Sequence, residues 1–221
     1  MLNKILVVSP HPDDETLGCG ASLVKWGAQG HVLYWLNLTG MKTEYGFSES
    51  AVCDRAAQIK RVGHEYGFKG TYDLGLRPAG LDRYPKSELT EKMHTVLSEV
   101  KPDRVIIPFK HDVHSDHVIT AEIVSSCTKV FRAPYVKEVL MMEICSETDF
   151  VTGSDSFYPN YFVDVSEQLL RKIDILKIYH TELGPFPFPR SVKALEALAR
   201  VRGAQSGCQY AEGFMVLKMM G

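Results

Sequence analysis

The sequence predicts an α/β fold built around a parallel sheet. Three observations lead to this prediction. Continuous apolar runs of strand length recur along the chain, stretches with helical apolar spacing lie between them, and turn or capping residues separate the two. Strands that alternate with helices in this way form right-handed βαβ units, whose strands are parallel and covered on both faces. With 221 residues, the chain is long enough to bury such a core as one domain.

The first half of the chain shows the alternation most clearly. The opening run KILVVS is apolar and stops at Pro10, as expected of a strand covered on both faces. Gly30 is a suitable C-cap for the helix that follows. Ser48 is a suitable N-cap for the second helix, Gly67 ends it, and Ser87 opens the third. The expected order is strand 4–9, helix 14–29, strand 31–39, helix 48–67, strand 71–76 and helix 87–100.

The second half continues the pattern and adds a longer C-terminal part. DRVIIPF is another buried strand, and a polar loop leads from it into a stretch with helical spacing. KEVLMMEI and YFVDVS are strand-like, and the proline-rich loop GPFPFP separates the last two helices. The expected order is strand 103–109, helix 115–131, strand 137–144, strand 161–166, helix 166–180 and helix 191–203. The loop at residues 40–50 is the best candidate for a lid.

Polar side chains gather where two of the expected strands end. The first strand leads into the motif His-Pro-Asp-Asp-Glu at residues 11–15, and the fourth leads into KHDVHSDH at residues 110–117. Ligands bind outside the carboxyl ends of the strands in an open parallel sheet, so the two clusters can converge on one point. Desolvating this much charge is costly unless a cation or a substrate compensates it. Imidazole and carboxylate groups without sulfur suit a catalytic Zn²⁺ or a similar divalent ion.

Each of these residues taken alone also has a purely structural interpretation. His11 would most often be a turn or core histidine, and Asp14 a helix N-terminal acid favoured by the helix dipole. Asp116 and His117 would form part of an N-terminal cap. The shared position of both clusters at one sheet edge makes metal binding the stronger interpretation.

The two motifs together resemble those of a known family. HPDDE after a first strand, with H-x-D-H after a later one, is similar to the LmbE/PIG-L family of zinc-dependent N-acetylglucosaminyl deacetylases. The C-terminal stretches PNYFVDVSEQLLRKIDILKIYHTE, FPRS and RGAQSGCQYAEGF also resemble that family. The resemblance implies one LmbE-like domain over residues 1–221, with a Rossmann-like, mostly parallel sheet flanked by helices on both faces. It implies Zn²⁺, or another divalent metal such as Fe²⁺, and an N-acetylated amino sugar as substrate.

The resemblance also implies a role for each clustered residue. His11, Asp14 and His117 correspond to the metal ligands, and Asp13 corresponds to the general base. His114 corresponds to the histidine that assists at the carbonyl oxygen. In this chemistry the base takes a proton from metal-activated water and returns it to the leaving amine, while protonated His114 stabilises the oxyanion.

Two aspartates of the second cluster are candidates for a supporting role. Asp116 or Asp112 can orient His114 through a hydrogen bond from behind. Either of them could equally cap the loop. The sequence leaves this choice open.

Three residues are candidates for substrate binding. The family's Arg-x-x-Glu motif appears here as Arg55-x-x-Gln58. Arg55 is therefore either a candidate substrate contact or a partner for charges on its own helix. Arg190, in FPRS, is either a substrate clamp or a salt-bridged helix start. Glu15 is either a helix N-terminal acid or an acceptor for a sugar hydroxyl, and the resemblance favours the second interpretation.

Composition excludes several other classes of protein. A net charge of −2, with 24% charged residues, gives no electrostatic footprint for nucleic acid. No apolar run is long enough for a transmembrane helix, and no signal peptide is recognisable. Five scattered cysteines indicate reduced thiols and a cytoplasmic protein. The sequence leaves open whether the protein is a homo-oligomer.

The residues therefore predict a zinc-dependent N-deacetylase. An amidase that cleaves a larger sugar or thiol conjugate would use the same metal chemistry. A Mg²⁺-dependent phosphoryl-transfer protein would use paired aspartates but would leave the histidines unexplained. A non-catalytic metal- or sugar-binding module would have no need for an unliganded base such as Asp13 beside the metal.

Overall fold

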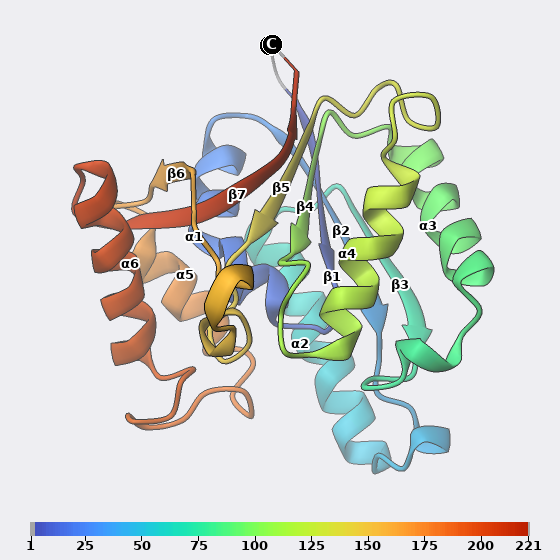
Figure 1. Ribbon diagram of the computed structural model, residues 1–221. Coiled ribbons are helices and arrows are strands. Elements are labelled where there is room, and N and C mark those ends of the chain that lie inside the picture. Colours follow the sequence, from blue (N-terminus) through green and yellow to red (C-terminus); the bar gives the residue numbers. More distant parts are fainter. Residues whose placement is uncertain (1–2, 221) are drawn as a thin grey trace.

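The computed structural model describes residues 3–220, which form a seven-stranded sheet with helices on both faces (Figure 1). The strand order across the sheet is β3-β2-β1-β4-β5-β7-β6. The strands are β1 Lys4–Ser9, β2 Val32–Thr39, β3 Gly70–Leu76, β4 Arg104–Pro108, β5 Glu138–Met142, β6 Tyr161–Asp164 and β7 Ala211–Met219. The helices are α1 Asp14–Ala28, α2 Glu49–Tyr66, α3 Lys86–Val100, α4 Ser115–Cys127, α5 Leu169–Leu176 and α6 Val192–Ser206. Short 3₁₀ turns lie at Thr43–Tyr45, Leu81–Arg83, Thr148–Phe150 and Gly153–Asp155.

Five neighbouring strands, from β3 to β5 across the sheet, run parallel, whereas β7 is antiparallel to both β5 and β6. The predicted α/β fold with a mostly parallel, helix-flanked sheet is therefore confirmed. Strand β7 is absent from the expected elements, although β6 and the other five strands are among them. A charged residue and a glycine, Glu212 and Gly213, interrupt its apolar pattern near its start and hide its strand character.

The hydrophobic core lies in two layers, one on each face of the sheet. Successive residues of β1 alternate between them, so that Leu6 and Val8 pack on one side and Ile5 and Val7 on the other. The first layer is completed by residues of α3 and α4, and the second by residues of α1, α2 and α5. The central strands are thus buried on both faces, which explains why their sequences are continuously apolar.

Some helix ends differ from the expected positions. The helix expected over 166–180 is confined to α5, because turns closed by the bonds from Gln168 N to Val165 O and from Tyr179 N to Leu176 O flank it. Helix α4 ends at Cys127 instead of continuing to 131. Helix α6 extends three residues past 203 to Ser206 and is capped by Gly207, which has a left-handed φ of 80°.

Helix α1 is interrupted near Cys19, whose φ of −147° and ψ of 20° are not helical. The backbone N–H groups of Ala21 and Ser22, just after the break, donate to the Glu212 carboxylate at 3.1 and 2.7 Å. Lys172 of α5 donates to the same carboxylate at 2.7 Å. The Glu212 carboxylate thus satisfies backbone groups that follow the break, and together with its ion pair to Lys172 it ties α1 to α5 and β7.

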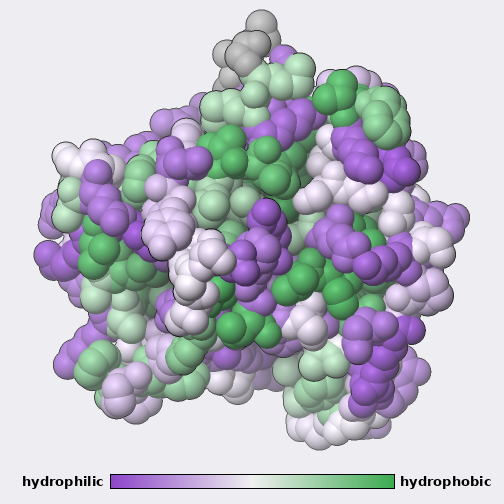
Figure 2. Space-filling view, viewed as in Figure 1, coloured by the Kyte–Doolittle hydropathy of each residue, from purple (hydrophilic) through white to green (hydrophobic). Residues whose placement is uncertain are grey.

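The molecular surface is of mixed character on the face seen in Figure 2, where hydrophobic and hydrophilic residues are interspersed. Over residues 3–220, none of the helices combines the length and the hydropathy that crossing a lipid bilayer requires.

The sheet topology brings the two polar clusters of the sequence together. Strands β1 and β4 are adjacent and parallel, so the loops that leave their carboxyl ends lie at the same edge of the sheet. The first loop leads directly into α1 and the second into α4. The motif at residues 11–15 therefore faces the first turn of α4.

Candidate active site

The three predicted metal ligands meet at this edge. His11 comes from the β1–α1 loop, Asp14 from the start of α1 and His117 from the first turn of α4. The Asp14 Oδ2 atom lies 3.2 Å from His11 Nδ1 and 3.3 Å from His117 Nε2. One potential ligand atom from each residue lies within 4.8 Å of the others. The structure thus brings together the ligand set that the sequence analysis named.

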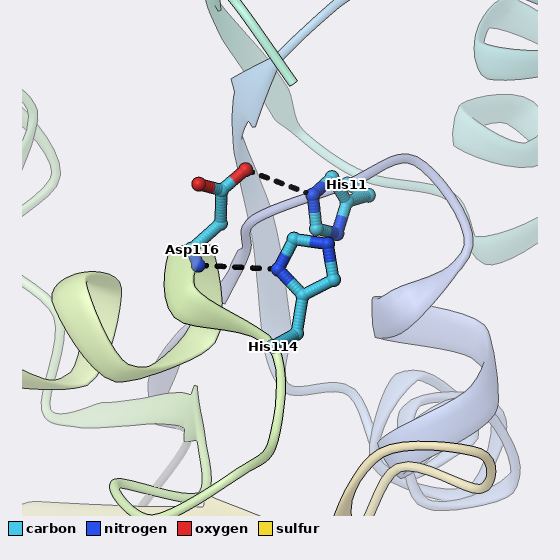
Figure 3. Close-up of side chains that lie close together, drawn as sticks. All are labelled: His11, His114 and Asp116. Carbon is cyan, nitrogen blue, oxygen red and sulfur yellow. Dashed lines mark hydrogen bonds and ion pairs between the residues drawn. The ribbon is translucent and has the colours of Figure 1, made fainter. Parts of the chain in front are cut away.

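Each histidine of this set is held from behind by a carboxylate. His11 Nε2 lies 3.1 Å from Asp116 Oδ2, and His117 Nδ1 lies 2.8 Å from Asp112 Oδ2 (Figure 3 for the first pair). A carboxylate behind a histidine fixes the orientation of the ring and makes its inner nitrogen a better metal ligand. The expectation that Asp116 or Asp112 orients His114 is corrected here, because both carboxylates contact the candidate ligands instead.

His114 is held by the backbone rather than by a carboxylate. Its Nδ1 accepts a hydrogen bond of 3.1 Å from the backbone N–H of Asp116, and its ring lies 4.5 Å from that of His11 (Figure 3). This bond assigns the proton of the neutral ring to Nε2. Burial, together with the neighbouring His11 and His117, lowers the pKa of His114 to about 4. The neutral ring is therefore favoured, and the protonated form expected from the sequence is corrected.

A divalent cation fits the chemistry of this donor set. Burial lowers the pKa of His11 and of His117, but nearby carboxylates outweigh it and raise the values to about 9 and about 10. The two histidines in turn outweigh burial at Asp14 and hold its pKa below the usual range. The raised pKa values of His11 and His117 indicate that the nearby carboxylates favour a positive charge at this edge.

A second group of three potential ligands, His11, His114 and Asp116, also lies close together. Several of its potential ligand atoms already accept hydrogen bonds from the backbone. The Asp116 carboxylate accepts backbone N–H bonds from Ala79 and Leu81 at 2.7 and 3.0 Å, and His114 Nδ1 already accepts a backbone bond. The set of His11, Asp14 and His117 is therefore the better cation site.

Asp13 stands beside the ligand set without belonging to it. Its φ of 141° lies in a region that L-residues rarely adopt, which costs of the order of 1–3 kcal/mol. Burial, Asp14 and Glu182 raise the pKa of its carboxyl group well above the usual range, against the opposing effect of Arg190. A strained, buried carboxyl group with a raised pKa is typical of a residue that exchanges protons during catalysis.

Glu15 does not fit its predicted role as a substrate contact. Its side chain is fully buried, and it is not among the residues that line the adjoining cavity. Its Oε2 accepts the backbone N–H of Asp13 at 3.0 Å, and its Oε1 accepts the hydroxyls of Thr16 and Tyr179 at 2.7 and 3.0 Å. With both oxygens engaged, Glu15 holds the backbone of Asp13 in place instead of meeting a sugar hydroxyl. Burial raises the pKa of Glu15 to about 7.

A cavity of about 240 Å³ opens beside the cluster. Both predicted substrate-binding arginines, Arg55 and Arg190, line it. Met41 and Phe47 of the loop at 40–50 also line it. This places the loop at the cavity, while its function as a lid stays a prediction.

The two arginines share one partner, Glu182, that sequence reasoning missed. Arg55 donates to the carbonyl oxygen of Pro12 at 2.8 Å and forms an ion pair with Glu182. Arg190 lies 2.9 Å from Asp13 Oδ2 and 3.2 Å from the second oxygen of Glu182. Arg55 therefore does not pair with charges on its own helix. A single glutamate in an irregular segment carries no sequence signal of such a role.

Known proteins that are similar to this chain include a sugar deacetylase. A model of the family PIG-L, described as GlcNAc-PI de-N-acetylase, matches residues 6–128. The chain is similar to the diacetylchitobiose deacetylase of Thermococcus kodakarensis, at 26% identity over 230 residues that cover 96% of this chain and 82% of that protein.

Solved structures share the fold over the whole chain. The conserved protein TT1542 from Thermus thermophilus has a TM-score of 0.78 and 26% identity, covering 100% of this chain and 97% of that one. GalB, the 4-carboxy-2-hydroxymuconate hydratase from Pseudomonas putida, has a TM-score of 0.77 at 14% identity, covering 100% and 98%. The second likeness shows the fold alone, so function has to be argued from the site.

Proposed function

The chain belongs to the PIG-L family of GlcNAc-PI de-N-acetylases, and from this membership we propose that it is a metal-dependent hydrolase that removes the N-acetyl group from an N-acetylglucosamine-type amino sugar or its conjugate. One observation carries the proposal. A largely buried His-His-Asp set lies directly beside an aspartate, Asp13, that is not part of the set and has a raised pKa. Residues 1–221 act as one deacetylase domain in this proposal, and the five free cysteines support the predicted cytoplasmic location.

The metal in this proposal is Zn²⁺ or another divalent ion such as Fe²⁺. His11, Asp14 and His117 would hold it, with Asp116 and Asp112 orienting the two histidines. When bound, such an ion supplies Lewis-acid activation of a water molecule and of the amide carbonyl.

The proton transfers fall to Asp13. Amide hydrolysis consumes one water and yields acetate and a free amine. Asp13 accepts the proton of the attacking water and then donates it to the nitrogen of the leaving amine as the C–N bond breaks. Its buried position and raised pKa suit a group that must both accept and release a proton near neutral pH.

His114 stabilises the charge that develops on the carbonyl oxygen. Its Nε2 carries the proton of the neutral ring, because Nδ1 accepts the backbone N–H of Asp116. A neutral imidazole can donate a hydrogen bond to the oxyanion without transferring a proton. The backbone bond also fixes the ring, so the donor requires little reorganisation during the reaction.

Several observations favour this function over its rivals. The T. kodakarensis relative is a diacetylchitobiose deacetylase, which supports an N-acetylated amino sugar as the substrate class. An amidase acting on a larger conjugate would use the same residues and is separated only by its substrate. Phosphoryl transfer does not account for His11, His114 and His117, and a pure binding module does not account for the strained Asp13.

Release of acetate tests the proposal directly. Metal-loaded protein is incubated with N-acetylated sugars, nucleotide sugars and thiol–sugar conjugates, and free acetate is quantified. We expect acetate from at least one amino sugar, its loss after chelation and its return when metal is restored. Acetate-free reactions across the whole panel, with metal bound at one ion per chain, would exclude deacetylation of these substrates.

A further inference from the structure

Glu182 lies in the segment between α5 and α6, and each of its carboxylate oxygens meets a different arginine. Oε1 forms the ion pair with Arg55, and Oε2 lies 3.2 Å from Arg190 Nη1. The neighbouring Thr181 hydroxyl donates to Oε1 at 3.1 Å. The side chain of Glu182 is 22% exposed and lines the cavity. One carboxylate thus bridges two guanidinium groups at the wall of the cavity.

The positive charge of each arginine already has a carboxylate partner. Arg55 is 6% exposed, and its guanidinium also donates to Pro12 O and Thr181 Oγ1 and lies 5.5 Å from the centre of the Tyr179 ring. Arg190 pairs with Asp13 at 2.9 Å in addition to Glu182. Each cation is therefore matched by at least one carboxylate at ion-pair distance.

More carboxylates than lysine or arginine side chains line the cavity. Among residues 3–220, the lysine and arginine side chains that line it are Arg55 and Arg190. The carboxylates that line it are those of Asp13, Asp14, Glu147 and Glu182. A carboxylate or phosphate that pairs with these two arginines would have to displace Glu182, which breaks two charge-assisted contacts, or lie close to the other carboxylates of the cavity wall. Sugar hydroxyls face neither obstacle, because they both donate and accept hydrogen bonds.

We propose that Glu182 determines specificity: by compensating both cavity arginines, it fits the cavity to uncharged amino sugars and disfavours those that carry a carboxylate or phosphate. This inference rests on the proposed function and narrows its substrate class. Glu182 acts through Arg55 and Arg190, so it is a positioning residue and takes no part in bond cleavage.

Two substitutions separate this role from a general effect of charge. Glu182→Gln removes the carboxylate partner of Arg55 and leaves Arg190 with Asp13 as its carboxylate partner, whereas Glu147→Gln removes the same charge from the same cavity without breaking a contact to either arginine. The probes are N-acetylglucosamine and N-acetylglucosamine 1-phosphate, which differ by the phosphate. Release of acetate gives kcat/KM for each. Calorimetric titration with glucosamine 1-phosphate, the deacetylated product, at equal metal content gives an affinity for the phosphorylated sugar that does not depend on turnover.

We expect the wild type to favour the uncharged sugar by roughly tenfold or more in kcat/KM. Glu182→Gln should move this ratio roughly 10–100-fold towards the phosphate and tighten its binding about tenfold, as expected for new charge-assisted hydrogen bonds. Glu147→Gln should move the ratio by less than about threefold. If Glu182→Gln does not fold, Glu182→Asp, which is too short to bridge both arginines, should shift the ratio in the same direction.

A wild type that prefers the phosphorylated sugar would overturn the inference. So would an equal shift in Glu147→Gln, because the effect would then come from total charge and not from the bridged arginines. If no sugar of any kind is deacetylated, the proposed function fails. The calorimetric comparison still decides the role of Glu182, because unchanged affinity for the phosphate in Glu182→Gln refutes it independently.

Discussion

Glu15 offers a sharp test of how the site is built, because the structure makes it a support for Asp13 and not a substrate contact. Glu15→Ala removes the acceptor of three buried donors: the Asp13 backbone N–H and the hydroxyls of Thr16 and Tyr179. The hydroxyls can turn towards other partners, but the backbone N–H cannot.

The expected loss of stability follows from these contacts. A buried donor left without an acceptor costs about 1–3 kcal/mol. With one donor fully stranded, two partly compensated and the buried volume of the side chain lost, we expect a loss of about 3–5 kcal/mol. In a chain of this size that corresponds to a fall in Tm of roughly 6–20 °C. Because Asp13 holds an unfavourable φ of 141°, its relaxation should also lower kcat by roughly 10–100-fold.

Glu15→Gln is the matched control. Its amide oxygen can still accept from Asp13, and its NH₂ group can donate to the hydroxyls of Thr16 and Tyr179, so we expect a loss of only about 1 kcal/mol. Tm by circular dichroism and kcat and KM from acetate release separate the two roles. An alanine variant with unchanged Tm and kcat but a raised KM would refute the supporting role and restore the predicted contact with substrate.

Three further substitutions probe the base, the metal and the fold. Asp13→Asn should keep its metal by elemental analysis while turnover falls roughly 10²–10⁴-fold, and loss of the metal would contradict the assignment of Asp13 as base. Asp112→Asn should weaken metal affinity roughly 10–100-fold in a chelator competition, because His117 loses its charged support, whereas the exposed Asp155→Asn should not. Glu212→Ala strands Lys172, so chemical denaturation should show about 3–5 kcal/mol of lost stability; a change below about 1 kcal/mol would argue against a contributing ion pair.

The sequence was sufficient to predict that the two polar clusters meet, and the family resemblance singled out His11, Asp14 and His117 among them. His11 and Asp14 follow β1 and His117 follows β4, and parallel strands place such residues at one edge regardless of loop detail. The expected partner of Asp112 or Asp116 was wrong: they were expected to orient His114, but they contact His117 and His11. Which ring Asp112 or Asp116 touches depends on the conformation of the β4–α4 loop and on the rotation of α4 about its axis, and residue spacing alone determines neither.

Long-range partners were beyond the reach of pattern reasoning for a different reason. In the sequence, Glu212 only interrupts an apolar run. Its role becomes clear in the structure, where Lys172 and the interrupted helix α1 contact its carboxylate. Glu182 has no periodic context at all, since it follows a turn in an irregular segment. In both cases a charge is tolerated only because a distant residue compensates it, and such compensation becomes visible only in three dimensions.

The residues proposed to hold the metal and transfer protons lie in the first part of the chain, and several residues that shape the cavity wall lie in a later segment. The family model ends at residue 128, and the candidate ligands, the base and Arg55 all precede that point. Tyr179, Glu182 and Arg190, which support or contact these residues, come from the segment between α5 and α6. Substitutions in that segment can alter the charge of the cavity wall without touching the metal ligands. Arg190 links the two parts, because it contacts both the base and Glu182, so a change in substrate charge at this wall is expected to alter the environment of the base as well.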